Sequence, residues 1–242
     1  PLDLVWYVPP DGRPIPPPEP DKHFRGRVEV ACFRSAWKDP DALYVAVKAG
    51  FNQVNHGNLD LGSFVLEALG QRWARDLGGD DYNLPGYWDG KPKGRRWTYY
   101  RLGSFSHNVC TINGQHQDAL AESKFLKFAP GLVTVDLTAA YRPHARAALR
   151  GIQLLDNRRR VLVQDDFLME SPGEILWGMT TGAEIAVEGA RAVLSQKGKQ
   201  LVARILAPPG ASFETESAER PPPENPNRGM RRLLVRLRDQ HG

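Results

Sequence analysis

The sequence predicts an all-β fold, an antiparallel β-sandwich of stacked sheets, and three observations lead to this prediction. Short segments alternate apolar and polar residues with a period of two, which is typical of half-buried strands; residues 133–137 are one example. Pairs of such segments flank polar turns, as the strands of hairpins do. No segment combines the length and the end signals of a stable helix. At 242 residues, a sandwich is expected rather than a small barrel.

Two hairpins are expected in the second half of the chain. The first joins residues 152–155 to residues 161–163 through a polar turn. The second joins residues 192–194 to residues 201–206 through the turn at 197–199. Both pairs predict antiparallel pairing of neighbouring strands.

The remaining segments complete this prediction. A last strand is expected over residues 232–237, after a proline-rich surface loop at 221–226. Residues 63–69 and 120–128 are the two segments with some helical character. Neither is long enough or well enough capped to outweigh the strand signals around it.

The domain organisation is expected to be simple, with a proline-rich linker at residues 1–22 and one β-sandwich domain at residues 23–242. Seven prolines fall between Pro9 and Pro20, and proline removes backbone donors and favours an extended linker. The chain begins with Pro1 and has no signal-peptide pattern. We therefore expect it to be a piece of a longer protein.

Composition narrows the class of protein. The chain is 41% hydrophobic and 25% charged, and no apolar run approaches the roughly 20 residues of a membrane-spanning helix. The formal net charge of +4 favours an anionic partner. Nucleic acid is not expected, because the basic residues are scattered and Arg158–Arg160 falls in a predicted turn. Cys32 and Cys110 are too far apart for a CxxC motif and are expected to be buried.

Signatures of several common enzyme classes do not occur in the sequence: GxSxG, HExxH, the P-loop and the dinucleotide fingerprint. Polar and aromatic residues instead concentrate between Asn55 and Gln117. Loops at the rims of sheets are where binding groups collect, so this band is the candidate site.

Three ordered motifs in this band resemble the C-terminal β-sheet domain of the heparinase II/III-like polysaccharide lyases. The similarity covers roughly residues 33–117 well and the later hairpins more loosely. The motifs are His56-Gly57-x-x-Asp60-x-Gly62-Ser63-Phe64, then Asp76-x-Gly78 after a strand, then Ser106-His107-Asn108 before a strand and an Asn113-Gly114 turn.

The resemblance implies a lyase that cleaves uronate-containing acidic glycans by β-elimination, in a periplasmic or secreted protein. In that family a helical toroid precedes the β domain, and the substrate cleft lies between the two. The toroid supplies further catalytic groups, including an Asn, a His and a Tyr. The chain contains no such segment, so half of the site is expected here and the chain alone is expected to have little activity.

The resemblance also assigns residues. His56 matches the first histidine of the family's His-x-His pair, beside the uronate carboxylate. Asn58 stands where the second histidine, a metal ligand, is expected. Asp76 and His107 match the other two ligands of a zinc site usually described as structural. Because Asn58 offers only a neutral carbonyl oxygen, zinc binding is expected to be weak or absent, or replaced by a harder cation.

Elimination requires a carboxylate neutralised by donors, a base for the C5 proton and an acid for the departing O4. His56, Asn58 and Arg101 are candidates for the first role, and Tyr82 and Trp97 for further substrate contacts. A tyrosine can act as base and acid if cationic neighbours lower its pKa. Spacing does not choose among the candidates, of which Tyr87 and Tyr99 are our preferred pair; the others are Tyr82 and Tyr100.

Other interpretations remain open at this point. The domain could be a carbohydrate-binding module without catalysis, or a metal-dependent hydrolase that uses Asp76 and His107 to activate water. His56 could have a purely structural role, in which it stabilises its own loop. The aromatic residues could form a packing cluster, and Asp80 and Asp81 could be turn residues.

Overall fold

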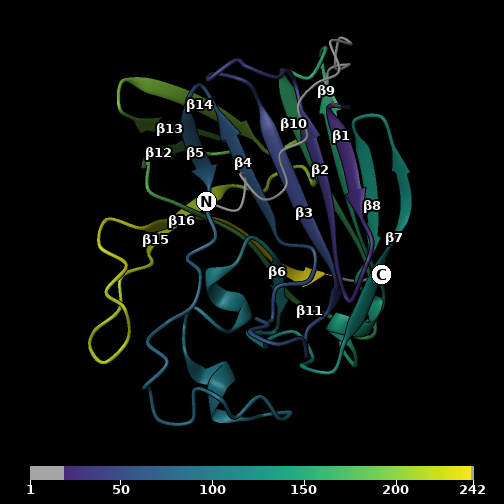
Figure 1. Cartoon of the computed structure of the whole chain (residues 1–242), viewed down its shortest axis with the longest axis vertical. Helices are drawn as coiled ribbons and strands as arrows, with labels where there is room; N and C mark the ends of the chain where they lie inside the picture. The colour runs from purple at the N-terminus through teal and green to yellow at the C-terminus, as the bar shows by residue number, and fades with distance from the viewer. Residues whose placement is uncertain (1–18, 241–242) are drawn as a thin grey trace, which may run out of the picture.

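The computed structural model describes residues 19–240, which form antiparallel sheets arranged as a sandwich (Figure 1). The largest sheet has nine strands in the order β1-β2-β3-β7-β8-β9-β10, with β4 paired to β3 and β5 to β4. Its strands are β1 (Asp21–Phe24), β2 (Val28–Arg34), β3 (Tyr44–Phe51), β4 (Phe64–Ala68), β5 (Gln71–Ala74), β7 (Glu122–Ala129), β8 (Leu132–Asp136), β9 (Ala145–Leu155) and β10 (Arg160–Met169).

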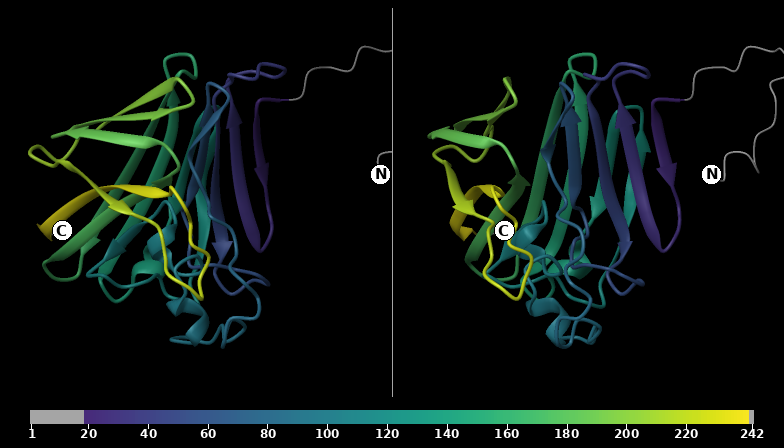
Figure 2. Two further views of the ribbon diagram at one scale, coloured as in Figure 1. Left: turned by 90° about the vertical axis from the view of Figure 1, so that its left-hand side faces the viewer. Right: turned by 60° about the vertical axis from the view of Figure 1, so that its left-hand side comes forward.

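Two smaller sheets form the second layer, which Figure 2 shows facing the large sheet. One has the order β15-β16-β11-β6 and the other β12-β13-β14. Their strands are β6 (Cys110–Ile112), β11 (Gly173–Thr181), β12 (Glu184–Glu188), β13 (Arg191–Gln196), β14 (Lys199–Arg204), β15 (Phe213–Ser217) and β16 (Arg231–Gln240). Three short 3-10 helices are η1 (Arg95–Thr98), η2 (Ser104–Ser106) and η3 (Thr138–Tyr141).

One continuous apolar core joins the layers. Alternate residues of each strand point inward, for example Val45 and Val47 of β3, Met179 of β11, Leu194 of β13 and Leu233 of β16. This is the period-two pattern that predicted the sandwich. Burial of these side chains is the main stabilising contribution, at about 1.5–3 kcal/mol for each large one.

The predicted fold is confirmed. The two hairpins are β9–β10 and β13–β14, and both pair antiparallel. The segments with some helical character are the strands β4 and β7, and the expected last strand is β16. Of the expected linker, residues 1–18 lie outside the described residues, and residues 21–22 belong to β1.

A fork in the large sheet positions the candidate site. One edge of β3 pairs with β4 over Tyr44–Val47 and with β7 at Gly50 and Phe51, while its other edge pairs with β2. The connection from β3 to β4, residues 52–63, therefore lies at the end of the sheet, where the two partners diverge. The loops and 3-10 helices of residues 75–109 lie at this same end (Figure 1).

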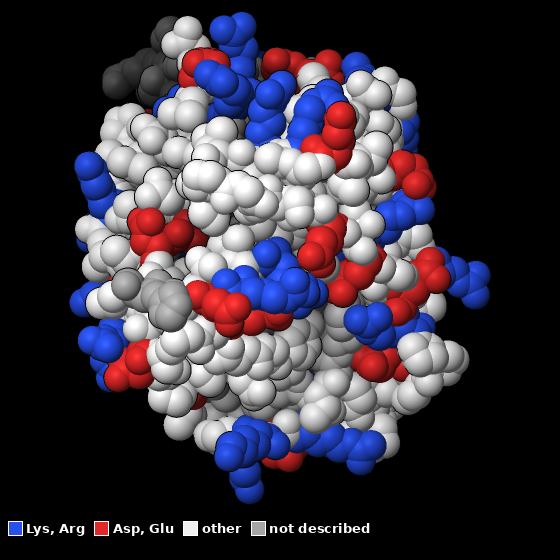
Figure 3. Space-filling view, turned by 180° about the vertical axis from the view of Figure 1, so that it is seen from behind, with Lys and Arg blue, Asp and Glu red and all other residues white. Residues whose placement is uncertain are grey.

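The face opposite to that of Figure 1 carries Lys and Arg side chains interspersed with Asp and Glu (Figure 3). Acidic neighbours reduce the local excess of positive charge there. No helix among the described residues is long and apolar enough to cross a membrane. The expectation that the chain does not bind nucleic acid stays a prediction.

Candidate functional site

The loop of residues 52–63 is shaped by its glycines and by backbone hydrogen bonds. A Cβ on Gly57 would lie 2.3 Å from the Asn52 carbonyl oxygen, so only glycine fits after His56. The Asn52 amide donates to the Ala121 carbonyl at 3.1 Å, which anchors the start of the loop to the residue that precedes β7. His56 itself has a positive φ of 59° and an exposed side chain. The turn thus presents the imidazole to solvent.

His56 belongs to a group of four rings, His56, Tyr82, Tyr87 and Trp88, which we call the aromatic platform. The Tyr82 hydroxyl lies 3.3 Å from His56 Nδ1, and the two rings stack with centroids 5.7 Å apart. Trp88 meets His56 edge-on at 5.6 Å. Tyr82 and Trp88 are 51% and 57% exposed, whereas Tyr87 is only 2% exposed and lies 5.0 Å from both. An imidazole and a phenol therefore share an open aromatic surface.

Arg96 fixes the platform relative to the His56 loop. Its Nε and Nη2 donate to the Gly57 carbonyl at 3.2 and 2.9 Å, and its Nη1 donates to the Tyr87 carbonyl at 2.8 Å. The guanidinium also lies over the Tyr87 ring, 4.7 Å from its centroid. Because Arg96 is buried, these charge-assisted contacts hold the two loops in one arrangement.

A second group, Asp60, Asp76 and His107, lies at the same end of the sheet, and we call it the carboxylate–histidine cluster. One potential ligand atom from each residue lies within 4.8 Å of the others. His107 Nδ1 is 3.1 Å from Asp76 Oδ2, and His107 Nε2 is 3.1 Å from the Arg101 carbonyl oxygen. Lys48 forms an ion pair with Asp60.

The cluster is electrostatically coupled. Burial alone would lower the pKa of the fully buried His107, but the charge and hydrogen bond of Asp76 outweigh it, so the pKa is raised. For Asp76, burial would raise the pKa, but His107 outweighs it and holds the pKa well below its usual range. Both His107 nitrogens face oxygen acceptors, which favours the doubly protonated ring. Without a cation, Asp76 and His107 form an ion pair.

These residues also fit a metal cation. Among residues 19–240 they are the one group of at least three His, Cys, Asp or Glu side chains with this spacing. Two carboxylates and an imidazole suit zinc or a harder divalent ion, once Nδ1 has lost its proton. Asn58 Oδ1 is buried and has no hydrogen-bond partner in the described part of the chain. No hydrogen bond joins Asn58 Oδ1 to the cluster among the described residues, so Asn58 as a ligand stays a prediction.

Asn108 holds the strands around the cluster together. Its Nδ2 donates to the carbonyls of Phe64 and Arg75 at 2.7 and 3.1 Å, and its Oδ1 accepts from the Thr180 amide at 2.6 Å. This explains the Ser-His-Asn motif in structural terms. The asparagine joins β4, the end of β5 and β11, and it places the neighbouring His107 between them.

Arg150 of β9 provides a second buried support. Its Nε and Nη2 contact the two carboxylate oxygens of Asp165 at 2.7 and 2.8 Å. Its Nη1 donates to the carbonyls of Gly62 and Asn108 at 2.8 and 2.6 Å. Arg150 of β9 therefore fixes two of the three segments that carry the cluster, those of Asp60 and His107.

Several residues assigned from the sequence have structural partners. Tyr99 is buried and its hydroxyl donates to the Pro85 carbonyl at 2.6 Å. Trp97 is buried and its Nε1 donates to the Lys91 carbonyl at 2.9 Å. Arg101 donates to Asn227 Oδ1 at 2.7 Å and to the Gly79 carbonyl at 2.9 Å. Their assigned roles stay predictions, and none of the three belongs to the aromatic platform.

The structure adds three residues to which no role is assigned from the sequence. Trp88 extends the exposed aromatic surface, Arg96 joins its two loops, and Asp60 completes the carboxylate–histidine cluster. Asp60 was visible in the first motif, two residues after Asn58. Trp88 and Arg96 had no comparable signal, because their contacts depend on how the loops fold.

Comparison with known proteins identifies the family. The Heparinase II/III-like, C-terminal family matches residues 31–220. The chain belongs to this family. No curated protein matches it significantly.

Solved structures agree with that assignment at the level of the fold. The heparan sulfate lyase HepC from Pedobacter heparinus is 17% identical with a TM-score of 0.68, covering 88% of this chain and 33% of its own. A heparinase III gene product is 19% identical with a TM-score of 0.71, covering 93% and 34%. The chain thus spans about a third of each of these proteins.

Proposed function

We propose that the chain is the β domain of a polysaccharide lyase that cleaves uronate-containing acidic glycans by β-elimination. The observation that carries this proposal is the pairing of the exposed His56 with the Tyr82 hydroxyl at 3.3 Å on an open aromatic surface. Membership of the heparinase II/III-like family supports it, and the heparan sulfate lyase named above is a protein of similar fold.

His56 is proposed to neutralise the uronate carboxylate. The C5 proton of a uronic acid becomes acidic only if the adjacent carboxylate is stabilised as negative charge develops on it. An exposed imidazole, held in one place by Gly57 and Arg96, can supply a donor there. Asn58 and Arg101 are the further candidates for this role.

Tyr82 suits the acid–base role better than our preferred sequence candidates. It is half exposed and beside His56, whereas Tyr87 is buried beneath it and the Tyr99 hydroxyl already donates to Pro85. In the proposed step the phenolate oxygen takes the C5 proton, a C4–C5 double bond forms, and the C4–O4 bond breaks. The same tyrosine then returns a proton to the departing O4.

The carboxylate–histidine cluster is proposed to hold a structural cation. Asp60, Asp76 and His107 would bind it, and when bound it would supply positive charge that fixes the loops of residues 52–63 and 75–109. The cluster is less suited to a hydrolytic metal, because the His107 side chain is fully buried and its Nε2 is hydrogen-bonded to the Arg101 carbonyl oxygen. Water activation needs an open coordination position.

The other half of the cleft is proposed to come from a helical toroid, which supplies the remaining catalytic groups. The proposed location is periplasmic or secreted, as polymeric acidic substrates lie outside the cell. Trp88 and Tyr82 would provide a stacking surface for a sugar ring.

The test is a lyase assay on a panel of uronate polymers, using the protein in which the chain is joined to its toroid. A product with near-ultraviolet absorbance from the new double bond supports the proposal. Tyr82→Phe should lower turnover by roughly 100-fold or more, while Arg146→Gln, an exposed arginine of β9 paired with Glu170, should not. Glycan binding without any product would instead identify a carbohydrate-binding module.

A further inference from the structure

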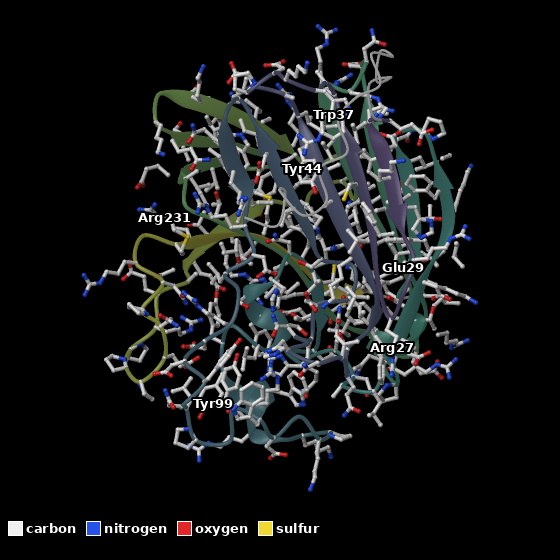
Figure 4. The ribbon with its side chains drawn as sticks, viewed as in Figure 1. Arg27, Glu29, Trp37, Tyr44, Tyr99 and Arg231 are labelled. Carbon is white, nitrogen blue, oxygen red and sulfur yellow. The ribbon has the colours of Figure 1, made fainter. Side chains whose placement is uncertain are left out.

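A polar cavity lies on the large sheet, toward the end of β3 that is opposite to the His56 loop. Its volume is about 490 Å³, and β2, β3, β4 and β5 all contribute to it. Figure 4 shows Tyr44 and Trp37 toward this end of the strands, and Tyr99 among the loops at the opposite end. We call this cavity the arginine pocket, since Arg34, Arg72 and Arg75 line it.

A row of cross-strand neighbours forms the floor of the arginine pocket. Arg34 pairs with Tyr44, Tyr44 with Glu67, and Glu67 with Arg72, each on adjacent antiparallel strands. Directly paired residues point to the same face of a sheet. The neighbouring Phe33 and Leu66 point into the core, so this row lies on the outer face.

Arg34 is oriented by aromatic rings rather than by an acidic partner. Its guanidinium carbon lies 4.7 Å from the Trp37 ring centroid and 4.5 Å from that of Tyr44. No hydrogen bond or ion pair of this guanidinium occurs within residues 19–240. Stacking restrains the plane of the group and leaves its N–H edge available, which is the geometry used to bind planar or tetrahedral anions.

The walls of the arginine pocket are tied to one another. The Leu43 amide donates to Ser35 Oγ at 2.9 Å, which closes the loop between β2 and β3. The Leu69 amide donates to the Asp41 carbonyl at 3.0 Å, which joins that loop to the β4–β5 turn. Gln196 Nε2 donates to the Arg72 carbonyl at 2.9 Å from β13. A preformed pocket loses less entropy on binding.

The charges in the arginine pocket leave a positive excess. Glu67 is paired with Arg72. Asp39 accepts a hydrogen bond from the Asp41 amide in its own loop. Neither Arg34 nor Arg75 has an acidic partner among the described residues, and Arg75 Nε is buried without a hydrogen-bond partner. Two guanidinium groups therefore share a pocket with one unpaired carboxylate.

We propose that the arginine pocket is an accessory binding site for an acidic saccharide, with Arg34 and Arg75 binding carboxylate or sulfate groups of the saccharide. The glycan as ligand rests on the proposed function, whereas the anion as ligand rests on the pocket alone. The eight residues of β3 place Arg34 and Tyr44 about 23 Å from the His56 loop, at roughly 3.3 Å per residue, whereas Arg75 lies nearer to that loop, next to Asp76. A polymer chain can span that distance, so the two sites would hold separate segments of one substrate.

The experiment measures binding of a heparan sulfate oligosaccharide by calorimetry to the 242-residue chain carrying His56→Ala and Trp88→Ala, which weaken the aromatic platform. In this background Arg34→Gln and Arg75→Gln should each weaken binding by about tenfold or more. Arg34→Lys keeps the charge but not the planar donor edge, so its affinity should lie between that of Arg34→Gln and that of the chain with Arg34 intact. Arg146→Gln, an exposed arginine of β9 paired with Glu170, is the control and should have no effect.

The arms of the experiment identify the group that is bound. Binding retained by a desulfated oligosaccharide assigns the pocket to the carboxylate, and binding lost assigns it to the sulfate. Affinity unchanged in both pocket variants, or equal binding of a neutral polysaccharide, would overturn the proposal. Because lyase activity is not measured, failure of this proposal is distinct from failure of the proposed elimination. Unchanged circular dichroism confirms that the variants fold.

Discussion

The two halves of the candidate site are built differently. The carboxylate–histidine cluster is the more enclosed half, with Asp60 and His107 buried and Asp76 at its exposed edge. Asp60 is paired with Lys48, and Asp76 with His107. The aromatic platform is open: within residues 19–240 and apart from ring contacts, His56 and Tyr82 have one side-chain hydrogen-bond contact, the 3.3 Å pair between them. Satisfied, buried polar groups give rigidity, whereas exposed groups with unused donors are available to a ligand.

This difference separates residues that build the site from residues that can act in it. Substitutions in the enclosed half should change the free energy of unfolding. Substitutions in the open half should change binding or turnover and leave the fold intact.

Arg150→Met should be the most destabilising change, at about 3–5 kcal/mol, because it leaves the half-enclosed Asp165 without its partner and two carbonyls without a donor. Chemical denaturation of both proteins measures this. The double variant Arg150→Met, Asp165→Leu should recover part of the loss, since no unpaired charge remains. A single variant as stable as the unaltered chain would contradict the account of how the cluster is held.

Stability should also fall in mild acid because of His116. Burial, with a smaller contribution from His107, lowers the pKa of His116 to about 4, and its Nδ1 accepts from the Ser104 amide at 3.0 Å. The folded pKa lies below the unfolded value, so the stabilisation is fully present above about pH 6.5 and is lost as the pH falls toward 4.

The loss due to His116 should reach at most ~3 kcal/mol over that interval. Denaturation curves at several pH values test it. His116→Gln, which keeps an acceptor but does not titrate, should flatten the dependence between pH 6.5 and 4. An unchanged slope in that variant would assign the acid sensitivity to other groups.

A divalent cation should stabilise the chain through the enclosed half. Zinc at 100 times its dissociation constant adds about 2.7 kcal/mol, and a chelator should reverse the effect. Asp60→Asn should abolish most of the gain in melting temperature, whereas Asp118→Asn, outside the cluster, should retain it. Stabilisation that persists in Asp60→Asn would place the ion elsewhere.

Trp88→Ala should have the smallest effect on stability, within about 0.5 kcal/mol, because more than half of the side chain is already exposed. It should instead weaken glycan binding several-fold through loss of a stacking surface. Comparing the melting temperature with the affinity of the same preparation measures both. A large drop in melting temperature would show that Trp88 supports the loop rather than the ligand.

The sequence predicted the fold better than the site. The strands and hairpins follow from local alternation, which one sequence contains in full, and the structure confirms them. It also brings together Asp76 and His107, which come from separate motifs. Spacing in the sequence does not choose among the tyrosines, and our proposal of Tyr82 depends on its exposure and on its contact with His56, which are set by the fold.

Other features of the site depend on contacts between distant residues. Arg96 contacts Gly57, which is 39 positions away in the sequence, as well as Tyr87, and Arg150 joins Gly62 to Asp165 across the sheet. Arg150 shares the inward-facing phase of β9 with Ala148 and Ile152, but its hydrogen-bond partners are set only by the assembled sheets. Arg96 lies in a short 3-10 helix among loops, where no period-two pattern marks it as buried.

The most direct test of the central claim is His56→Ala in the protein that joins the chain to its toroid, with turnover and melting temperature measured on one preparation. The open position of the imidazole predicts a loss of turnover of roughly 100-fold or more, with little change in melting temperature. A variant with a clearly lower melting temperature but full turnover in its folded fraction would contradict the claim and make His56 a loop anchor.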